Sequence, residues 1–167
     1  SLDRRQRQMC IRDRTLVAVS CIVAADMFPA LLIVKAVTRI GWKVEFERWA
    51  GKVVHPNEIH MIESSEDQLE DAVQPKVVIC SYQMAVNLGL SLRRRRWSCA
   101  VVDESHCLRD CKFGRESLTL QEVRELLSNI PHLLFLTGTP CEKSPADMFS
   151  QVPVSYTHLR AHETDRY

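Results

Sequence analysis

The stretch 98–110, SCAVVDESHCLRD, starts with small and apolar residues and runs directly into two adjacent carboxylates, Asp103 and Glu104. A short apolar run of this kind is typical of a strand buried on both faces of a parallel sheet. Side chains placed just after such strands lie at the carboxyl edge of the sheet, where α/β proteins bind their ligands. The pair is therefore either a magnesium site or an acidic strand end without a function of its own.

Strand-like and helix-like segments alternate along the rest of the chain, and Pro131 follows the last clear amphipathic helix as a stop. The segment 15–25 is apolar almost all round and could be a helix or a strand. This alternation predicts an α/β fold, a mainly parallel sheet with helices on both faces. Strands are expected at 28–34, 57–64, 76–82 and 98–104, and 132–140 is expected to be a last strand followed by a tight turn. Helices are expected at 41–50, 65–73, 83–92, 117–130 and 144–152.

The composition limits the classes of protein that remain. The 167 residues are 46% hydrophobic and 26% charged, which is typical of a globular domain with its own core. No apolar run approaches the roughly 20 residues of a membrane span, so we expect no membrane partner. The seven cysteines are scattered and form no CxxC, which favours a reducing, intracellular compartment. His106, Cys107 and Cys111 have no second ligand pair nearby, so structural zinc is not expected.

The two ends of the chain differ from its centre. Met9–Asp13 (MCIRD) can be encoded by a string whose reverse complement encodes Val154–His158 (VSYTH), as in a translated sequencing-library adapter. We therefore expect 1–14 and 153–167 to be non-native tails and exclude them from fold reasoning. The tails hold seven of the 22 Lys and Arg and four of the 21 Asp and Glu, so 15–152 has a net charge of −2. Bulk charge thus gives no evidence for nucleic-acid binding.

A second cluster of polar residues follows the last strand, in the segment 134–140, LFLTGTP. Taken alone, this segment is simply a tight turn that Gly138 makes possible. Together with VVDESH at 101–106, it resembles motifs II and III of superfamily-two helicases, and within them the Swi/Snf-type DNA translocases. The segments 29–49 (PALLIVKAVTRIGWKVEFERW) and 77–88 (VVICSYQMAVNL) resemble motifs Ia and Ib of that family. The form of motif II, with SPADMFSQV at 144–152, is most similar to the annealing-helicase, fork-remodelling branch.

The resemblance implies that 15–152 is part of the first RecA-like lobe of an ATPase that uses ATP with Mg. Asp103 would hold the magnesium ion, Glu104 would be the catalytic base, and Thr15 would be the last threonine of the phosphate loop and the second magnesium ligand. The parent protein would be a nuclear ATP-dependent translocase acting on branched, forked or duplex DNA.

The resemblance also assigns coupling and DNA-facing residues. It implies that His106 links the nucleotide site to motif III, whose residues couple hydrolysis to DNA contact. The coupling residues of motif III would be Thr137, Gly138 and Thr139, and those toward the DNA backbone would be Val37, Thr38, Ser81 and Tyr82.

The sequence departs from the family at two places. Motif Ia normally has proline where this chain has Lys35. The family's phosphate loop, Gly-Leu-Gly-Lys-Thr, is absent before Thr15, and Arg14, which takes the position of its lysine, falls in the adapter-like tail. Backbone N–H groups and the lysine of that loop cradle the phosphates. We therefore expect this chain, which also lacks the upstream strand and the second lobe with its arginine finger, to have no measurable ATPase activity.

Several alternatives remain at this stage. The chain could be a catalytically silent DNA- or protein-binding module derived from a helicase lobe, or an unrelated flavodoxin-like enzyme. A Gly-x-Gly-Lys run upstream of Thr15 in the gene would favour the ATPase. The arginines at 93–96 could contact DNA phosphates or form a solvated loop. Trp42, Phe46 and Trp49 could stack on bases, but their helical spacing favours core packing.

Overall fold

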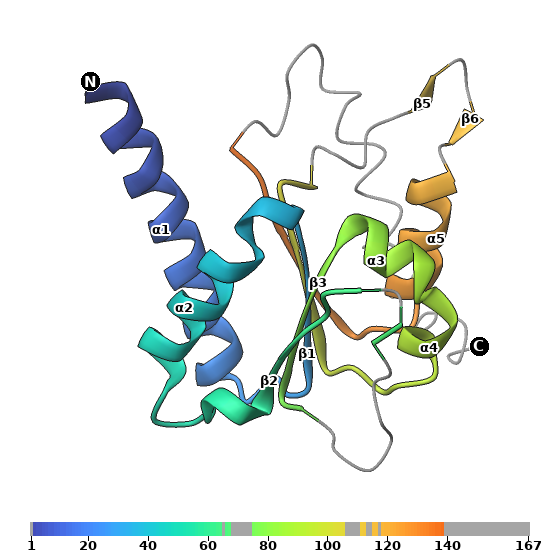
Figure 1. The fold of residues 1–167 in the computed structure, drawn as a ribbon, viewed down its shortest axis with the longest axis horizontal. Coiled ribbons are helices and arrows are strands. Elements are labelled where there is room, and N and C mark those ends of the chain that lie inside the picture. Colours follow the sequence, from blue (N-terminus) through green and yellow to red (C-terminus); the bar gives the residue numbers. More distant parts are fainter. Residues whose placement is uncertain are drawn as a thin grey trace, which may run out of the picture.

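The core of the molecule is a five-stranded sheet in which every described pairing is parallel (Figure 1). The computed structural model describes residues 2–64, 66–67, 75–105, 111–112, 115–116 and 118–138. The strand order is β2-β3-β1-β4-β7, so three strands lie inside the sheet and β2 and β7 form its described edges. The strands are β1 (Ala30–Val34), β2 (Ile59–Met61), β3 (Val77–Ser81), β4 (Cys99–Asp103) and β7 (His132–Leu136).

Helices cover both faces of this sheet, which confirms the predicted α/β fold (Figure 1). One face carries α1 and α2, and the other carries α3, α4 and α5. Among the described residues, no helix is both long and apolar enough to cross a membrane. The helices are α1 (Leu2–Ala24), α2 (Arg39–Ala50), α3 (Tyr82–Asn87), α4 (Gly89–Arg93) and α5 (Leu118–Leu127), with short 3₁₀ turns η1 (Ala36–Thr38) and η2 (Pro56–Glu58).

Two hydrophobic clusters, one on each face, hold these layers together. Successive residues of a strand point to opposite faces, and in β1 Leu31 and Ile33 join the α3–α5 cluster while Leu32 joins the other. Every residue of β1, β3 and β4 is buried. Two-sided burial is the physical reason that these strands are unbroken apolar runs instead of alternating ones.

The structure settles or changes several sequence expectations. The ambiguous segment 15–25 is helical up to Ala24 and belongs to α1, which continues back to Leu2 through most of the segment set apart as a tail. The small antiparallel pair β5 (Cys111–Lys112) and β6 (Arg115–Glu116) was not anticipated. The helix expected at 144–152 lies outside the described residues, and so does most of the one at 65–73.

One expectation for α2 was wrong. Trp42 and Phe46 are buried as predicted, but Trp49 is 46% exposed. Its indole N–H donates to the Glu45 carboxylate at 2.7 Å, and the guanidinium of Arg48 lies 5.0 Å from the ring centre. Ala50, the last residue of α2, takes the inward position in this turn. Local polar partners thus hold Trp49 at the surface.

The α2 packing gives a direct test of the α1–α2 cluster. Phe46→Ala removes a fully buried ring, so we expect it to lower the free energy of unfolding by about 3–5 kcal/mol. Val44→Ala, on the same helix but 53% exposed, should change it by less than about 0.5 kcal/mol. Urea denaturation followed by circular dichroism measures both. Similar losses in the two variants would contradict the described orientation of α2.

Candidate functional site

Asp103 and Glu104 lie where β4 ends at the carboxyl edge of the sheet. Asp103 is the last residue of the strand and is only 7% exposed. Glu104 follows with φ of 53°, a left-handed conformation that is uncommon for a residue with a side chain. The chain therefore leaves the sheet abruptly at this point. Such strained positions persist only where the surrounding structure fixes them, and they cluster at functional sites.

Three hydrogen bonds hold Asp103. Its Oδ2 accepts from the indole Nε1 of Trp42 at 2.9 Å, and its Oδ1 accepts from the backbone N–H of Glu104 at 2.9 Å. The hydroxyl of Tyr82 donates to the backbone carbonyl of Asp103 at 2.6 Å. The carboxylate is thus fixed from α2 and its backbone from α3. Each carboxylate oxygen keeps acceptor capacity for a further ligand.

Burial sets the acidity of this carboxyl group. Loss of hydration raises the pKa of Asp103, and the neighbouring charge of Glu104 raises it further, while the hydrogen bond from Trp42 opposes the rise. The folded protein therefore holds the Asp103 proton to a higher pH than the unfolded chain does. Stability from this group is present at low pH and declines as the pH rises above the unfolded value of about 4.

Arg14 brings α1 to the same place. Its guanidinium Nη2 lies 3.5 Å from Oε1 of Glu104, in a partly buried ion pair. The same guanidinium lies 3.5 Å from where a Cβ at Gly138 would be, just beyond β7. Thr15, the next residue of α1, is 5% exposed. Residue 14 of α1, the end of β4 and the turn after β7 therefore lie next to one another. Arg14 is the residue that takes the position of the family's lysine.

The residues that the resemblance placed toward DNA lie at this edge too. Val34 is paired with Ser81 in register, so the ends of β1 and β3 coincide. The Ser81 side chain accepts from the N–H of Met84 at 3.2 Å and caps α3. Thr38 donates to the carbonyl of Lys35 at 2.9 Å and closes η1. Val37, between them, is 89% exposed.

The two coupling residues that can be placed fall in the same region. Thr137 and Gly138 follow β7, whose Leu136 pairs in register with Asp103. His106 and Thr139 lie outside the described residues. The predicted site residues that lie on the described strands, or directly after them, are therefore all at the carboxyl edge of the sheet. Sequence reasoning missed Trp42 and the hydroxyl of Tyr82 as anchors of Asp103, and its only clue to the first was a tryptophan in motif Ia.

The donor set suits magnesium. Carboxylate and hydroxyl oxygens are the ligands this ion prefers, and it usually keeps several waters and is held by only one or two carboxylates together with phosphates. Within the described ranges, no group of three or more His, Cys, Asp or Glu could form an all-protein metal cage. Asp103 and its surroundings therefore fit an ion that arrives with a nucleotide.

The hydrogen bond between Trp42 and Asp103 can be tested through stability. Trp42→Phe keeps most of the buried ring but removes the indole donor, so it should cost about 1.5–3 kcal/mol at pH 7. Because loss of the donor raises the pKa of Asp103 further, the deficit should shrink toward pH 4. Trp49→Phe, which removes an exposed indole, is the matched control for urea unfolding at both pH values. A deficit independent of pH, or equal to that of the control, would contradict the proposed role of the bond.

Known proteins share this sequence and fold. The SNF2-related domain family matches residues 4–154. The chain is 28% identical to the SWI/SNF-related matrix-associated actin-dependent regulator of chromatin subfamily A-like protein 1 of Bos taurus, covering 83% of this chain and 14% of that protein. It is 27% identical to the DNA annealing helicase and endonuclease ZRANB3 of Homo sapiens, covering 84% of this chain and 13% of that protein. The chain thus spans a small part of the length of these relatives.

Solved structures agree on the fold. The SWI2/SNF2 ATPase core of Sulfolobus solfataricus in complex with double-stranded DNA has a TM-score of 0.64 at 20% identity, over 86% of this chain and 30% of that one. The Hef helicase domain of Pyrococcus furiosus has a TM-score of 0.60 at 18% identity, over 77% and 27% of the two chains. The parallel sheet, the carboxylate pair at its edge and the match over 4–154 lead to one conclusion: the chain belongs to the SNF2-related domain family, with the fold of the SNF2 ATPase core.

Proposed function

We propose that residues 15–152 are part of the nucleotide-hydrolysing lobe of an ATP-dependent DNA translocase that remodels branched or forked DNA. The observation that carries the proposal is the fixed carboxylate of Asp103, next to Glu104 at the carboxyl edge of a parallel sheet. Among the relatives, ZRANB3 is named as a DNA annealing helicase, which supports the fork-remodelling branch. The chromatin-related names of others support a nuclear location.

The proposed roles follow from what each side chain can do. When bound with the nucleotide, magnesium would neutralise charge on the phosphates, and Asp103 and Thr15 would hold it. Trp42 keeps the Asp103 carboxylate in one orientation, so this side chain would not have to change its conformation when the magnesium ion binds. The side chain of Glu104 is 19% exposed, which leaves it open to a water molecule whose proton it would accept as general base.

The DNA-facing and coupling roles are proposals of the same kind. Val37 and Thr38 lie in the η1 turn beyond β1, where Val37 protrudes into solvent. Ser81 and Tyr82 begin α3 beside them, so DNA passing over this edge would contact both turns. His106, with Thr137, Gly138 and Thr139 in motif III, would relay the nucleotide state to that surface.

The chain itself is proposed to be inactive in hydrolysis. Residues 1–14 contain no glycine, so no backbone loop of the Gly-x-Gly-Lys type precedes Thr15 in it. We interpret 1–14 and 153–167 as adapter-like tails. The second candidate function is a catalytically silent DNA- or protein-binding module. In this chain Arg14, a residue of the adapter-like tail, engages the Glu104 carboxylate in an ion pair, which supports inactivity of the chain itself.

An ATPase assay on the 167-residue chain tests this inactivity. With Mg and duplex DNA present, ATP turnover should not exceed that of the Glu104→Gln variant, because residues 1–14 contain no glycine-rich loop that could cradle the phosphates. Release of inorganic phosphate is the measurement. Turnover that Glu104→Gln abolishes would refute the proposal of inactivity, and it would exclude the silent module as well.

A longer natural protein containing 15–152 tests the translocase proposal. There, Glu104→Gln should lower DNA-stimulated ATP hydrolysis by about 10²–10⁴-fold, the usual contribution of general-base catalysis. Glu47→Gln makes the same chemical change on α2, away from the carboxyl edge, and should leave the rate unchanged. If the longer protein has no DNA-stimulated activity, or if both variants behave alike, the assignment of Glu104 as the base is wrong.

A further inference from the structure

The sequence of β7 is typical of an interior strand, yet β7 lies at a described edge of the sheet. Leu133 and Phe135 pack against the α3–α5 cluster, and Leu134 and Leu136 pack against the α1–α2 cluster. Both faces of the strand are therefore apolar, as in β1, β3 and β4. Those three strands are buried throughout, whereas the four apolar side chains of β7 are only half-buried. The helical layers on the two faces thus stop before they cover β7 completely.

The backbone of β7 has one outer side that no described strand occupies. Among the described strands, β7 pairs only with β4, in an unbroken register from His132 to Leu136. The other side of an edge strand presents a row of N–H and C=O groups that can hydrogen-bond to a further strand. The chemistry of this surface therefore suits an extended polypeptide, which would satisfy these groups.

The two edges of the sheet differ in how well they resist such pairing. Proteins protect edge strands with charges, proline, bulges or very short length. β2 is protected by its length of only three residues. β7 has five residues, contains no Lys, Arg, Asp, Glu or Pro, and has no bulge in its register with β4. Pairing is therefore expected at the β7 edge and not at the β2 edge.

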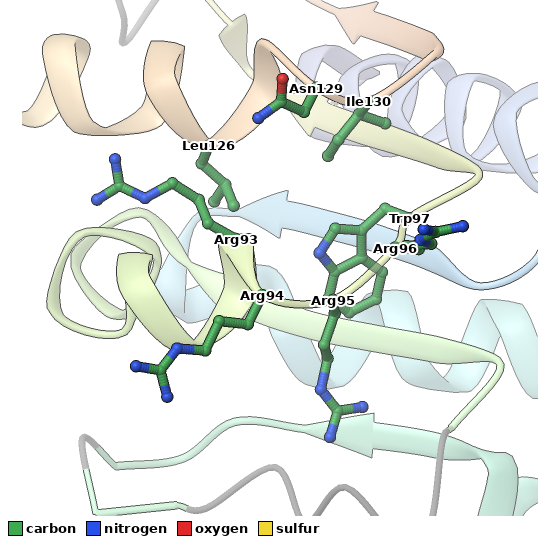
Figure 2. A pocket seen from close by; sticks show the side chains of 8 residues that line it. All are labelled: Arg93, Arg94, Arg95, Arg96, Trp97, Leu126, Asn129 and Ile130. Carbon is green, nitrogen blue, oxygen red and sulfur yellow. The ribbon is translucent and has the colours of Figure 1, made fainter.

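The turn that leads from α5 into β7 is fixed. Ile130 is 2% exposed, and its N–H donates to the carbonyl of Leu127 at 3.1 Å. Figure 2 shows Asn129 and Ile130 on one side of an open recess, with the side chains of Arg94 and Arg95 extending away from them. A strand that is already held in its extended form loses little conformational freedom when a partner binds. The β7 edge is thus preorganised for pairing.

We propose that the outer edge of β7 pairs with β7 of a second copy of this chain, in antiparallel orientation about a two-fold axis. All five residues pair when Leu134 faces its equivalent in the second copy and His132 faces Leu136. No two ionisable side chains oppose each other in this register, so no like charges resist the pairing. Because each copy offers one unprotected edge, the assembly closes as a dimer.

The apolar side chains of β7 favour a second copy as the occupant. In this two-fold pairing each face of the sheet continues into the same face of the second copy, so Leu133 faces Phe135 on one face and Leu134 faces its equivalent on the other. Both hydrophobic clusters thereby extend across the interface, in a continuous sheet with five strands from each copy. The carboxyl edges of the two halves lie at opposite ends of that sheet. Dimerisation therefore leaves both candidate sites open and is independent of the proposed function.

Sedimentation equilibrium on the 167-residue chain tests for the dimer. A single strand pairing buries a small interface, so we expect a monomer–dimer equilibrium with a dissociation constant of about 1–100 μM. Hydrogen exchange followed by mass spectrometry locates the contact. Amides of 132–136 should exchange more slowly at the high end of that concentration range than at the low end, whereas amides of β2 should be unaffected.

A charge exchange at position 134 tests the register. Leu134→Lys places two positive charges opposite each other and should weaken self-association by about tenfold or more. Leu134→Glu should do the same, but an equimolar mixture of the two variants should associate again, because opposite charges then face each other. Ile40→Lys changes an apolar residue of α2 that is 68% exposed, and as the control it should leave the dissociation constant unchanged. The exchange measurement needs no variant, so it still decides if a charge at position 134 prevents folding.

Three results would overturn the proposal, and all three leave the proposed function untouched. The first is a monomer at every concentration, with exchange at 132–136 that does not depend on concentration. The second is loss of association in Ile40→Lys but not in Leu134→Lys, which would move the contact to the exposed face of α2. The third is growth beyond the dimer, which would exclude a closed two-fold pairing.

Discussion

Burial of the sheet on both faces is the constraint on which the rest of this structure depends. A parallel sheet has no short hairpin connections, so each strand requires a crossover, and the crossovers place helices on its faces. Once β1, β3 and β4 are covered on both sides, polar side chains are excluded from their interiors. The polar residues of these segments are therefore displaced to the strand ends. The location of the candidate site is a consequence of this exclusion.

Asp103 is the one carboxylate that this arrangement buries among the residues the structure describes. Removing it from water raises the pKa of Asp103, and the protein offsets part of that penalty with the Trp42 indole and the Glu104 backbone N–H. Each of these donors comes from an element that the sheet already positions. The same hydrogen bonds that make burial tolerable fix the direction in which the carboxylate can bind a cation. Stability and the proposed chemistry are linked through this group.

Much of this organisation was predictable from local sequence, because apolar runs report burial and turn residues report strand ends. The strands, the parallel sheet and the meeting of Asp103 with Thr137 and Gly138 at one edge all followed from that pattern. Contacts between residues distant in sequence did not. Trp42 and Asp103 are 61 positions apart, and Arg14 and Glu104 are 90 apart, so no periodicity connects them. Trp49 was wrongly predicted to be buried, because the spacing of residues along a helix does not show that Glu45 and Arg48 provide polar partners for the ring at the surface.

The hydroxyl of Tyr82 joins the first residue of α3 to the backbone of Asp103. A rigid-body displacement of α3 larger than a hydrogen-bond length must either break this bond or drag the end of β4 with it. Because Ser81 caps α3 through its own side chain, the start of the helix cannot fray to absorb the motion without losing that cap. Movement of the start of α3 would thus reach the backbone of Asp103 through this single hydrogen bond. Tyr82 therefore connects the start of α3, in the segment that resembles motif Ib, to the end of β4, in the segment that resembles motif II.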